Sequence, residues 1–180
     1  MFYDIYSDSP VGRLLLLSDG ESLTGLQMEG QRYNHIEKGL VQSKNLPIFL
    51  QVKEWLDEYW QGNRPDIAGL TLKMQGSAFQ QKVWSILQTI PYGRYITYGD
   101  IAKQISQIMG KPKMSAQAVG GAVGHNPICI IVPCHRVIGA HGNLTGYDGG
   151  IDKKIILLRH EGVDMAKFSL SKKHYRTVIK

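Results

Sequence analysis

Apolar and polar residues along the first 30 positions indicate short strands joined by tight turns. The stretches FYDIYS, RLLLLS and LTGLQM are rich in residues that favour strands, and the turn sequences DSPVG and DGES separate them. We therefore expect a small antiparallel sheet made of consecutive hairpins.

A helical period comes next. From Leu46 to Gly62, apolar side chains recur every three or four positions, and Gly62 supplies a stop signal. This spacing predicts one amphipathic helix that covers the sheet. Residues 63–76 contain the Asn, Pro and Gly typical of a connector. We place a domain boundary at its end, which gives an N-terminal domain over 1–76 and a second domain over 77–180.

The second domain begins with a strong helix signal. Ser77 and Gln80 have the spacing of a capping box, an apolar face follows, and Pro91 ends the pattern. A last helix is expected from about Asp152, with Gly162 as its stop. The predicted fold class is α/β in the α+β sense: a small antiparallel sheet with a covering helix, then a mainly helical domain with a basic C-terminal tail.

Between these helices, the pattern predicts a short strand and two more helices. Thr97 and Asp100 resemble a weaker cap for the first, and Ser115 can cap the second, AQAVGGAVGHN, which follows the basic turn KPKM. Two helices joined by a short turn indicate a helix-turn-helix. The small residues of the second helix suit close approach to a nucleic-acid groove, but they equally suit a tightly packed internal helix.

Charge is distributed unevenly between the two predicted domains. Residues 1–76 carry 7 Lys and Arg against 10 Asp and Glu, a net charge of −3, whereas residues 77–180 carry 14 against 5, a net charge of +9. A basic excess confined to one domain is what binding to a polyanion requires. A generally basic surface without a partner is the alternative, and the helix pair in the basic half favours DNA.

The chain has the composition of an ordinary globular protein, with 43% hydrophobic and 20% charged residues. Its longest uncharged apolar run, residues 127–134, is far shorter than the roughly 20 residues that span a membrane. The N-terminus carries an acid where a signal peptide would have a base. We expect an intracellular protein with no membrane partner.

The two cysteines, Cys129 and Cys134, flank the segment IIVP, whose three β-branched residues favour an extended chain. In an extended chain they would lie about 16 Å apart on opposite faces. That geometry excludes a disulfide, and it also excludes a zinc site formed with His125 and His135. We therefore expect no metal.

Cys134 stands at the end of that run, next to His135. A small buried hydrophobe is the ordinary role of such a cysteine, whereas a nucleophile would need a base and a group that orients the base. His135 is the candidate base, and Glu161, beside Gly162 at a helix end, is the candidate orienting group. A solvated acid at a helix end is the alternative for Glu161.

The motif PCHRV, preceded by GHNP and followed by GYDGG and LLRHEG, resembles the methylated-DNA-protein-cysteine S-methyltransferases, also called O6-alkylguanine-DNA alkyltransferases. The resemblance runs from about Phe79 to Val163, and the first domain fits more loosely as that family's variable, ribonuclease H-like domain. It implies a DNA repair protein that flips O6-alkylguanine out of double-stranded DNA. The alkyl group would pass irreversibly to Cys134 in a single turnover, without a cofactor, in a monomer.

The resemblance also implies a role for each matching residue. Cys134 would accept the alkyl group, His135 would deprotonate it through a water, and Glu161 would hold the imidazole. Asn126 would brace the turn that carries Cys134, and Tyr98 would help to protonate the leaving guanine. The residues implied for binding the flipped base are Val137, Tyr147, Asp148 and Gly149. Those implied for binding DNA are Arg94, Ser115, Ala116, Gln117, Ala118, Gly120 and Gly121.

The chemistry of the thiol agrees with these roles, since a cationic imidazole beside Cys134 would raise the thiolate population and depress the thiol pKa. One departure from the family stands out: Gln117 occupies the position of an arginine that usually fills the space left by the flipped base.

Two alternative functions remain for this sequence, a DNA-binding protein without transfer activity and a thiol hydrolase with a Cys-His-Glu triad. O4-alkylthymine is a second candidate lesion.

Overall fold

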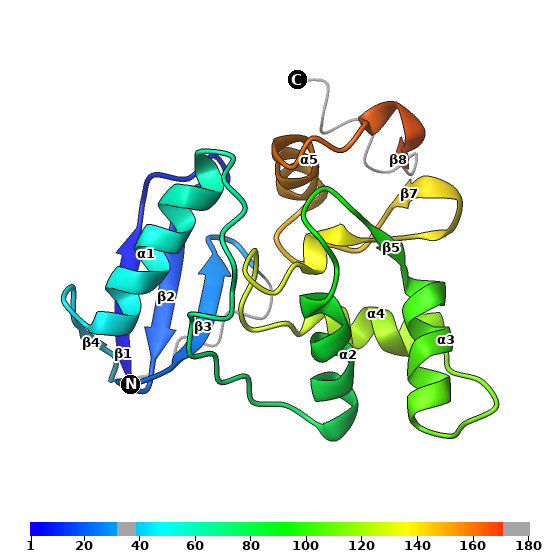
Figure 1. The fold of residues 1–180 in the computed structure, drawn as a ribbon, viewed down its shortest axis with the longest axis horizontal. Helices are drawn as coiled ribbons and strands as arrows, with labels where there is room; N and C mark the ends of the chain where they lie inside the picture. The colour runs from blue at the N-terminus through cyan, green and yellow to red at the C-terminus, as the bar shows by residue number, and fades with distance from the viewer. Residues whose placement is uncertain (32–38, 171–180) are drawn as a thin grey trace. The chain divides into compact units, whose positions relative to one another are not determined.

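The structure is a computed structural model that describes residues 1–31 and 39–170 (Figure 1). The basic C-terminal tail over 171–180 lies outside the described residues. The chain divides into two compact units, one made of 1–75 with 127–131 and one made of 76–126 with 132–180. The short segment 127–131 therefore belongs with the first unit although it lies within the predicted second domain.

The first unit contains a four-stranded sheet. Its strands are β1 (Phe2–Tyr6), β2 (Leu14–Ser18), β3 (Leu23–Met28) and β4 (Val41–Gln42), in the spatial order β3-β2-β1-β4. The predicted hairpins are confirmed, because β1 pairs with β2 and β2 with β3 in antiparallel fashion. The sheet is mixed rather than purely antiparallel, since β4 adds to the other edge of β1 in parallel.

One helix, α1 (Pro47–Trp60), covers this sheet as predicted (Figure 1). Its apolar face is buried: Ile48, Phe49, Val52, Trp55, Leu56 and Tyr59. Two polar contacts join it to β1, the Lys53–Asp4 ion pair and the bond that the Tyr6 hydroxyl donates to Asp57 at 2.7 Å. Burial of the apolar stripe and these contacts together hold the helix on the sheet.

The second unit is mainly helical, which agrees with the predicted α+β fold class. Its helices are α2 (Ala78–Gln88), α3 (Tyr98–Ile108), α4 (Ala116–Gly124) and α5 (Ile151–His160), with single 3₁₀ turns η1 (Cys134–Arg136), η2 (Ala140–Gly142) and η3 (Met165–Lys167). Two short parallel pairs complete it: β5 (Ile96–Thr97) with β6 (Val137–Ile138), and β7 (Asn143–Leu144) with β8 (Ser169–Leu170). No helix among the described residues is both long and apolar enough to cross a membrane.

The three predicted caps are confirmed. Ser77 and Gln80 form a full capping box at the start of α2. The Thr97 hydroxyl accepts from the Asp100 backbone N–H at 3.0 Å, and Ser115 caps α4. Such bonds satisfy backbone donors that the first helical turn leaves without an intrahelical partner, so each helix begins where its cap stands.

Helices α3 and α4 are the two members of the predicted helix-turn-helix pair, joined by residues 109–115. Trp84 of α2 reaches α4, where its indole N–H donates to the Ala122 carbonyl at 2.8 Å. The inner side of α4 is buried through Val119, Ala122 and Val123, while its outer side is exposed. The helix is therefore packed on one side only, and its small residues leave the other side accessible.

A separate hydrophobic cluster supports the C-terminal part of the second unit. It consists of Ile138, Leu144, Ile151, Ile155, Leu158 and Val163, with Tyr147, Met165 and Phe168 packed against it. Figure 1 shows α5, β7 and β8 together, apart from the group formed by α2, α3 and α4. This cluster fixes α5 beside the loop 145–150.

The predicted extended strand before Cys134 is wrong. Residues 129–131 form a turn, with Ile130 at φ +67° and the Ile131 N–H donating to the Cys129 carbonyl at 2.8 Å. The chain turns here because it pairs with β3: the Leu26 N–H donates to Pro127 and the Cys129 N–H donates to Leu26, each at 2.9 Å. The separation of about 16 Å between Cys129 and Cys134 was expected for an extended chain, so it does not apply to this turn. Both cysteines are buried, and no disulfide joins them.

Candidate active site

Cys134 begins the 3₁₀ turn η1 and is only 6% exposed. The turn before it is organised around one carbonyl. The Val132 oxygen accepts from the Asn126 side-chain amide at 2.7 Å and from the Cys134 backbone N–H at 2.8 Å. The predicted bracing residue thus lies against the turn that holds the thiol, and hydrogen bonding by Asn126 lowers the pKa of Cys134 against the larger effect of burial.

The structure brings His135 and Glu161 together, although 25 residues separate them in sequence. The Nε2 atom of His135 lies 2.7 Å from Oε1 of Glu161, and both side chains are fully buried. Glu161 directly follows the last residue of α5. The alternative of a solvated acid at a helix end is wrong, because the helix end packs against η1.

A third residue, Arg136, holds the same carboxylate. Its Nε lies 2.9 Å from Oε2 of Glu161 and its Nη2 lies 2.9 Å from Oε1, while the Gly93 N–H donates to Oε2 at 3.0 Å. Burial alone would raise the pKa of Glu161, but His135 and Arg136 outweigh burial and hold it well below its usual range. Glu161 is therefore a carboxylate at neutral pH.

The charge of Glu161 settles which ring nitrogen of His135 carries the proton. A carboxylate only accepts hydrogen bonds, so Nε2 donates to it and Nδ1 of the neutral ring is left as an acceptor. Nδ1 is buried and has no hydrogen-bond partner among the described residues. The imidazole is thus oriented with its basic nitrogen available.

The expected cationic imidazole and depressed thiol pKa are both wrong for the resting protein. Burial lowers the pKa of His135 in spite of Glu161, so the ring is neutral. Burial also raises the pKa of the Cys134 thiol, against smaller lowering effects of Asn126, Lys154 and Tyr147. The physical reason is desolvation, which disfavours the charged form of each group. The site therefore holds a thiol beside a neutral base.

Lys154 is a residue of the site that sequence reasoning missed. It lies on α5 with no exposed surface, and its Nζ donates to the carbonyls of Val137 at 2.6 Å and Thr145 at 3.2 Å. Burial lowers its pKa to about 8, and attraction to the Cys134 thiolate opposes this shift. A signal existed in the sequence, because Lys154 stands three positions after Ile151 and four before Leu158, on the apolar face of the helix.

Two tyrosines lie near Cys134. The Tyr98 hydroxyl donates to the Gly146 carbonyl at 2.8 Å, and burial, with a smaller effect of Cys134, raises the pKa of Tyr98. Hydrogen bonding by Tyr147 lowers the pKa of the Cys134 thiol, and the ring centroids of the two tyrosines each lie 5.9 Å from Lys154 Nζ. Of the other residues predicted to bind the base, Val137 is fully buried in β6, and Asp148 and Gly149 are half-buried in the loop 145–150.

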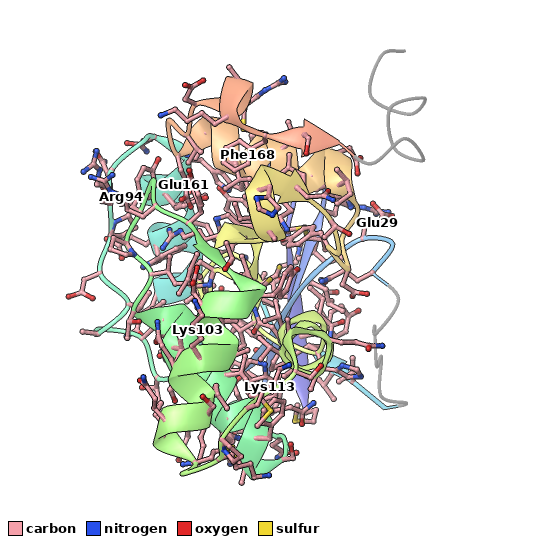
Figure 2. All side chains as sticks on the ribbon, turned by 90° about the vertical axis from the view of Figure 1, so that its right-hand side faces the viewer. Glu29, Arg94, Lys103, Lys113, Glu161 and Phe168 are labelled. Atoms are coloured by element: carbon pink, nitrogen blue, oxygen red, sulfur yellow. The ribbon has the colours of Figure 1, made fainter. Side chains whose placement is uncertain are left out.

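Five of the seven residues predicted to bind DNA lie on the exposed side of α4 or at its N-cap. Those exposed there are Ser115, Ala116, Gln117, Ala118 and Gly121. Gly120 instead faces Tyr98, since a Cβ at this position would lie 3.9 Å from the tyrosine ring. Arg94 is exposed in the loop before β5, and Figure 2 shows its side chain directed outward. Lys103 on α3 and Lys113 in the turn before α4 add exposed positive charge (Figure 2).

A buried cysteine followed by an oriented histidine, in the same unit as a helix pair whose second helix has one accessible side, is the arrangement expected of a DNA-binding protein with a reactive cysteine. Two family models match the chain, "6-O-methylguanine DNA methyltransferase, DNA binding domain" over residues 78–163 and the "ribonuclease-like domain" of the same family over residues 1–74. The chain belongs to the O6-methylguanine DNA methyltransferase family, and the resemblance carried by PCHRV is confirmed.

Similar proteins agree over nearly the full length. Methylated-DNA–protein-cysteine methyltransferase of Haemophilus influenzae is 44% identical over 161 residues, which cover 89% of this chain and 87% of that protein. The protein of the same name from Mycolicibacterium paratuberculosis is 46% identical, over 89% of this chain and 95% of its own length. A crystal structure of Mycobacterium tuberculosis OGT in complex with DNA is 40% identical with a TM-score of 0.78, over 93% and 95% of the two chains.

Proposed function

We propose that this protein repairs O6-alkylguanine in double-stranded DNA by moving the alkyl group to the sulfur of its own Cys134, once per molecule. The observation that carries the proposal is the buried hydrogen bond between Glu161 and His135, the residue that directly follows Cys134, which leaves Nδ1 of the neutral ring without a partner among the described residues. Family membership supplies the class of substrate, and a solved relative is described in complex with DNA.

The proposed reaction begins with removal of the thiol proton. His135 Nδ1 accepts the proton through a bridging water, while Glu161, itself held by Arg136, accepts a hydrogen bond from Nε2 on the other side of the ring. The resulting thiolate attacks the alkyl carbon, a C–S bond forms and the bond between that carbon and O6 breaks. A proton equivalent to the one lost by the thiol ends on the guanine, so charge and atoms balance.

Tyr98 is the proposed proton donor to the departing guanine. Burial raises its pKa, so the phenol is protonated at neutral pH and presents an O–H that can donate a hydrogen bond to the departing base. Val137, Tyr147, Asp148 and Gly149 form the proposed surroundings of the flipped base. Flipping costs a few kcal/mol, which contacts in this region would offset.

The accessible face of α4 is the proposed DNA-binding surface. Its exposed side chains are small apart from Gln117, so the helix backbone can approach a groove closely. Arg94, with the exposed lysines of α3 and of the turn before α4, would neutralise phosphates. All of these residues lie within 77–180, which supports the proposed division into a ribonuclease H-like domain over 1–76 and a DNA-binding, alkyl-accepting domain over 77–180.

The proposal also includes a second lesion, the oligomeric state and the absence of a cofactor. O4-alkylthymine is the second candidate lesion, because its alkyl carbon is attached to oxygen in the same way. The protein would act as a monomer inside the cell, since a single chain holds the complete proposed chemistry. No cofactor takes part, because the thiol itself accepts the alkyl group.

The test is a titration of duplex DNA that contains O6-methylguanine, with the protein first limiting and then in excess. We expect loss of lesion equal to the amount of protein, with the methyl group on the peptide that contains Cys134 by mass spectrometry. Cys134→Ser should bind the duplex and transfer nothing, because an alcohol ionises too weakly. Cys129→Ser, a matched change at the other buried cysteine, should transfer normally. Repeated turnover would indicate a hydrolase, and binding without loss of lesion would indicate a DNA-binding protein only.

A further inference from the structure

The turn formed by residues 90–93, between α2 and β5, meets the buried pair of Glu161 and Arg136. At the start of the turn, Arg136 Nη1 donates to the Ile90 carbonyl at 2.5 Å. At its end, the Gly93 N–H donates to Oε2 of Glu161 at 3.0 Å. Figure 2 shows Glu161 beside the segment that carries Arg94, the next residue. The turn 90–93 therefore contacts both members of the pair through its own backbone.

The two oxygens of the Glu161 carboxylate have different partners. Oε1 lies 2.7 Å from Nε2 of His135. Oε2 accepts from Arg136 Nε at 2.9 Å and from the Gly93 N–H at 3.0 Å. Hydrogen bonds to a charged oxygen are stronger than those between neutral groups, and a planar carboxylate cannot rotate while both of these are kept. The partners of Oε2 therefore fix the direction in which Oε1 faces the histidine.

Position 93 requires a residue without a side chain. Gly93 has φ +71°, in the left-handed region that glycine adopts at no steric cost. A Cβ at this position would lie 2.8 Å from the backbone carbonyl oxygen of Glu161, whereas ordinary contacts of a Cβ begin at 3.4 Å. A backbone oxygen at a helix end cannot turn aside as a flexible side chain can. Any side chain at position 93 would therefore push the turn and the end of α5 apart.

The turn is also anchored independently of Gly93. The Tyr92 hydroxyl donates to the His160 carbonyl at 3.2 Å, and the guanidinium carbon of Arg136 lies 5.8 Å from the centre of the Tyr92 ring. Strand β5, which follows the turn, pairs with β6, which follows η1. With the turn held at these points, the Gly93 N–H keeps a defined place against the carboxylate.

We propose that Gly93 is a positioning residue for the alkyl transfer. Its backbone N–H and its lack of a side chain hold Glu161 in the orientation that binds His135. Gly93 acts through Glu161 and does not touch the reacting atoms. The inference rests on the proposed function for the reaction itself, but the bond between His135 and Glu161 can be measured without DNA.

The experiment compares Gly93→Ala with Gly62→Ala. Gly62 follows α1 in the first unit, at φ +84°, and a Cβ there would meet no heavy atom within 4 Å. Both substitutions impose a left-handed alanine, but Gly93→Ala also displaces Glu161. The NMR signal of the His135 Nε2 proton reports the bond to Glu161. We expect it to move upfield in Gly93→Ala, because the bond lengthens, and to stay in place in Gly62→Ala.

Single-turnover transfer from O6-methylguanine in duplex DNA, at saturating duplex, measures the consequence. Gly93→Ala should slow transfer by about 10-fold to 100-fold, since small displacements in a catalytic site have effects of this size. Its DNA affinity should stay close to that of the parent, and Gly62→Ala should transfer at the parent rate. An unmoved His135 signal would overturn the inference. A normal rate at saturation with weakened DNA binding would also overturn it, and would assign Gly93 to the placement of Arg94.

Two further results distinguish the possible failures. If Gly93→Ala moves the His135 signal but the parent leaves O6-methylguanine DNA unchanged, the proposed function is wrong and the positioning role of Gly93 stands. If Gly93→Ala does not fold, the amide proton of Gly93 in Glu161→Gln decides. Its NMR signal should move upfield from its place in the parent, because a neutral amide oxygen is a weaker acceptor than a carboxylate, while the Gly62 amide signal stays in place. An unmoved Gly93 signal would overturn the inference.

Discussion

Arg136 holds both oxygens of the Glu161 carboxylate, with Nε 2.9 Å from Oε2 and Nη2 2.9 Å from Oε1. The carboxylate side chain is fully buried, and the guanidinium side chain is 11% exposed. Because Arg136 neutralises Glu161, the carboxylate can stay ionised in the interior while His135 stays neutral. This arrangement leaves the imidazole oriented, neutral and basic.

Removal of Arg136 should therefore cost more than loss of a surface ion pair. Arg136→Met leaves the Glu161 carboxylate buried without its cation, and breaking such a pair typically lowers the free energy of unfolding by about 3–5 kcal/mol. The exposed pair between Arg13 and Glu29, at 2.7 Å, provides the control. Urea denaturation of Arg13→Met should show little change. Equal, small effects of both substitutions would contradict the burial argument.

Glu161 should also give the protein a distinct acid sensitivity. Its folded-state pKa lies below the ordinary value of about 4.3. Between these two pKa values, Glu161 is protonated in the unfolded chain and ionised in the folded chain. Stability from this group is thus present above about pH 5 and is lost as the pH falls. In urea denaturation at several pH values, the stability advantage over Glu161→Gln should shrink below pH 5. Glu21→Gln, at an exposed position, should track the wild type at every pH.

His135 should matter most where the thiol cannot ionise unaided. A positioned general base contributes typically about 10²–10⁴-fold, so His135→Ala should slow methyl transfer from duplex DNA by that order at neutral pH. The deficit should narrow toward high pH, where hydroxide deprotonates the thiol. Single-turnover rates between pH 6 and 10 measure this. His160→Ala removes a half-buried histidine at the end of α5 and should leave the pH profile unchanged.

Gln117 offers a test of the DNA-binding face. If this exposed residue fills the gap left by a flipped base, Gln117→Arg should speed transfer from duplex DNA. It should also steepen the salt dependence of binding by about one released counterion. Reaction with free O6-benzylguanine, which needs no flipping, should hardly change. Gln107→Arg adds the same charge at an exposed position of α3. An equal gain from both variants, or a changed free-base rate alone, would show that Gln117 does not face the DNA stack.

Local signals explain which parts of the fold could be predicted. The capping box of Ser77 and Gln80 and the Ser115 cap each act within four residues, so helix starts were visible in the sequence. The turns DSPVG and DGES similarly determined the first three strands. The run before Cys134 was misjudged, because its β-branched residues favour a strand locally, while pairing with Leu26 of β3 imposes a turn with Ile130 at positive φ.

By itself, the sequence determined the family, through PCHRV and its flanking motifs, and it identified Cys134, His135 and Glu161 as a set. Only the tertiary structure decided their charge states and partners. Burial raises the pKa of Cys134 and lowers that of His135, and it places Lys154 and Arg136 as the two cations of the site. The physical reason is that desolvation and charge pairing depend on which distant segments surround a group, whereas motif and spacing record only which residues are adjacent along the chain.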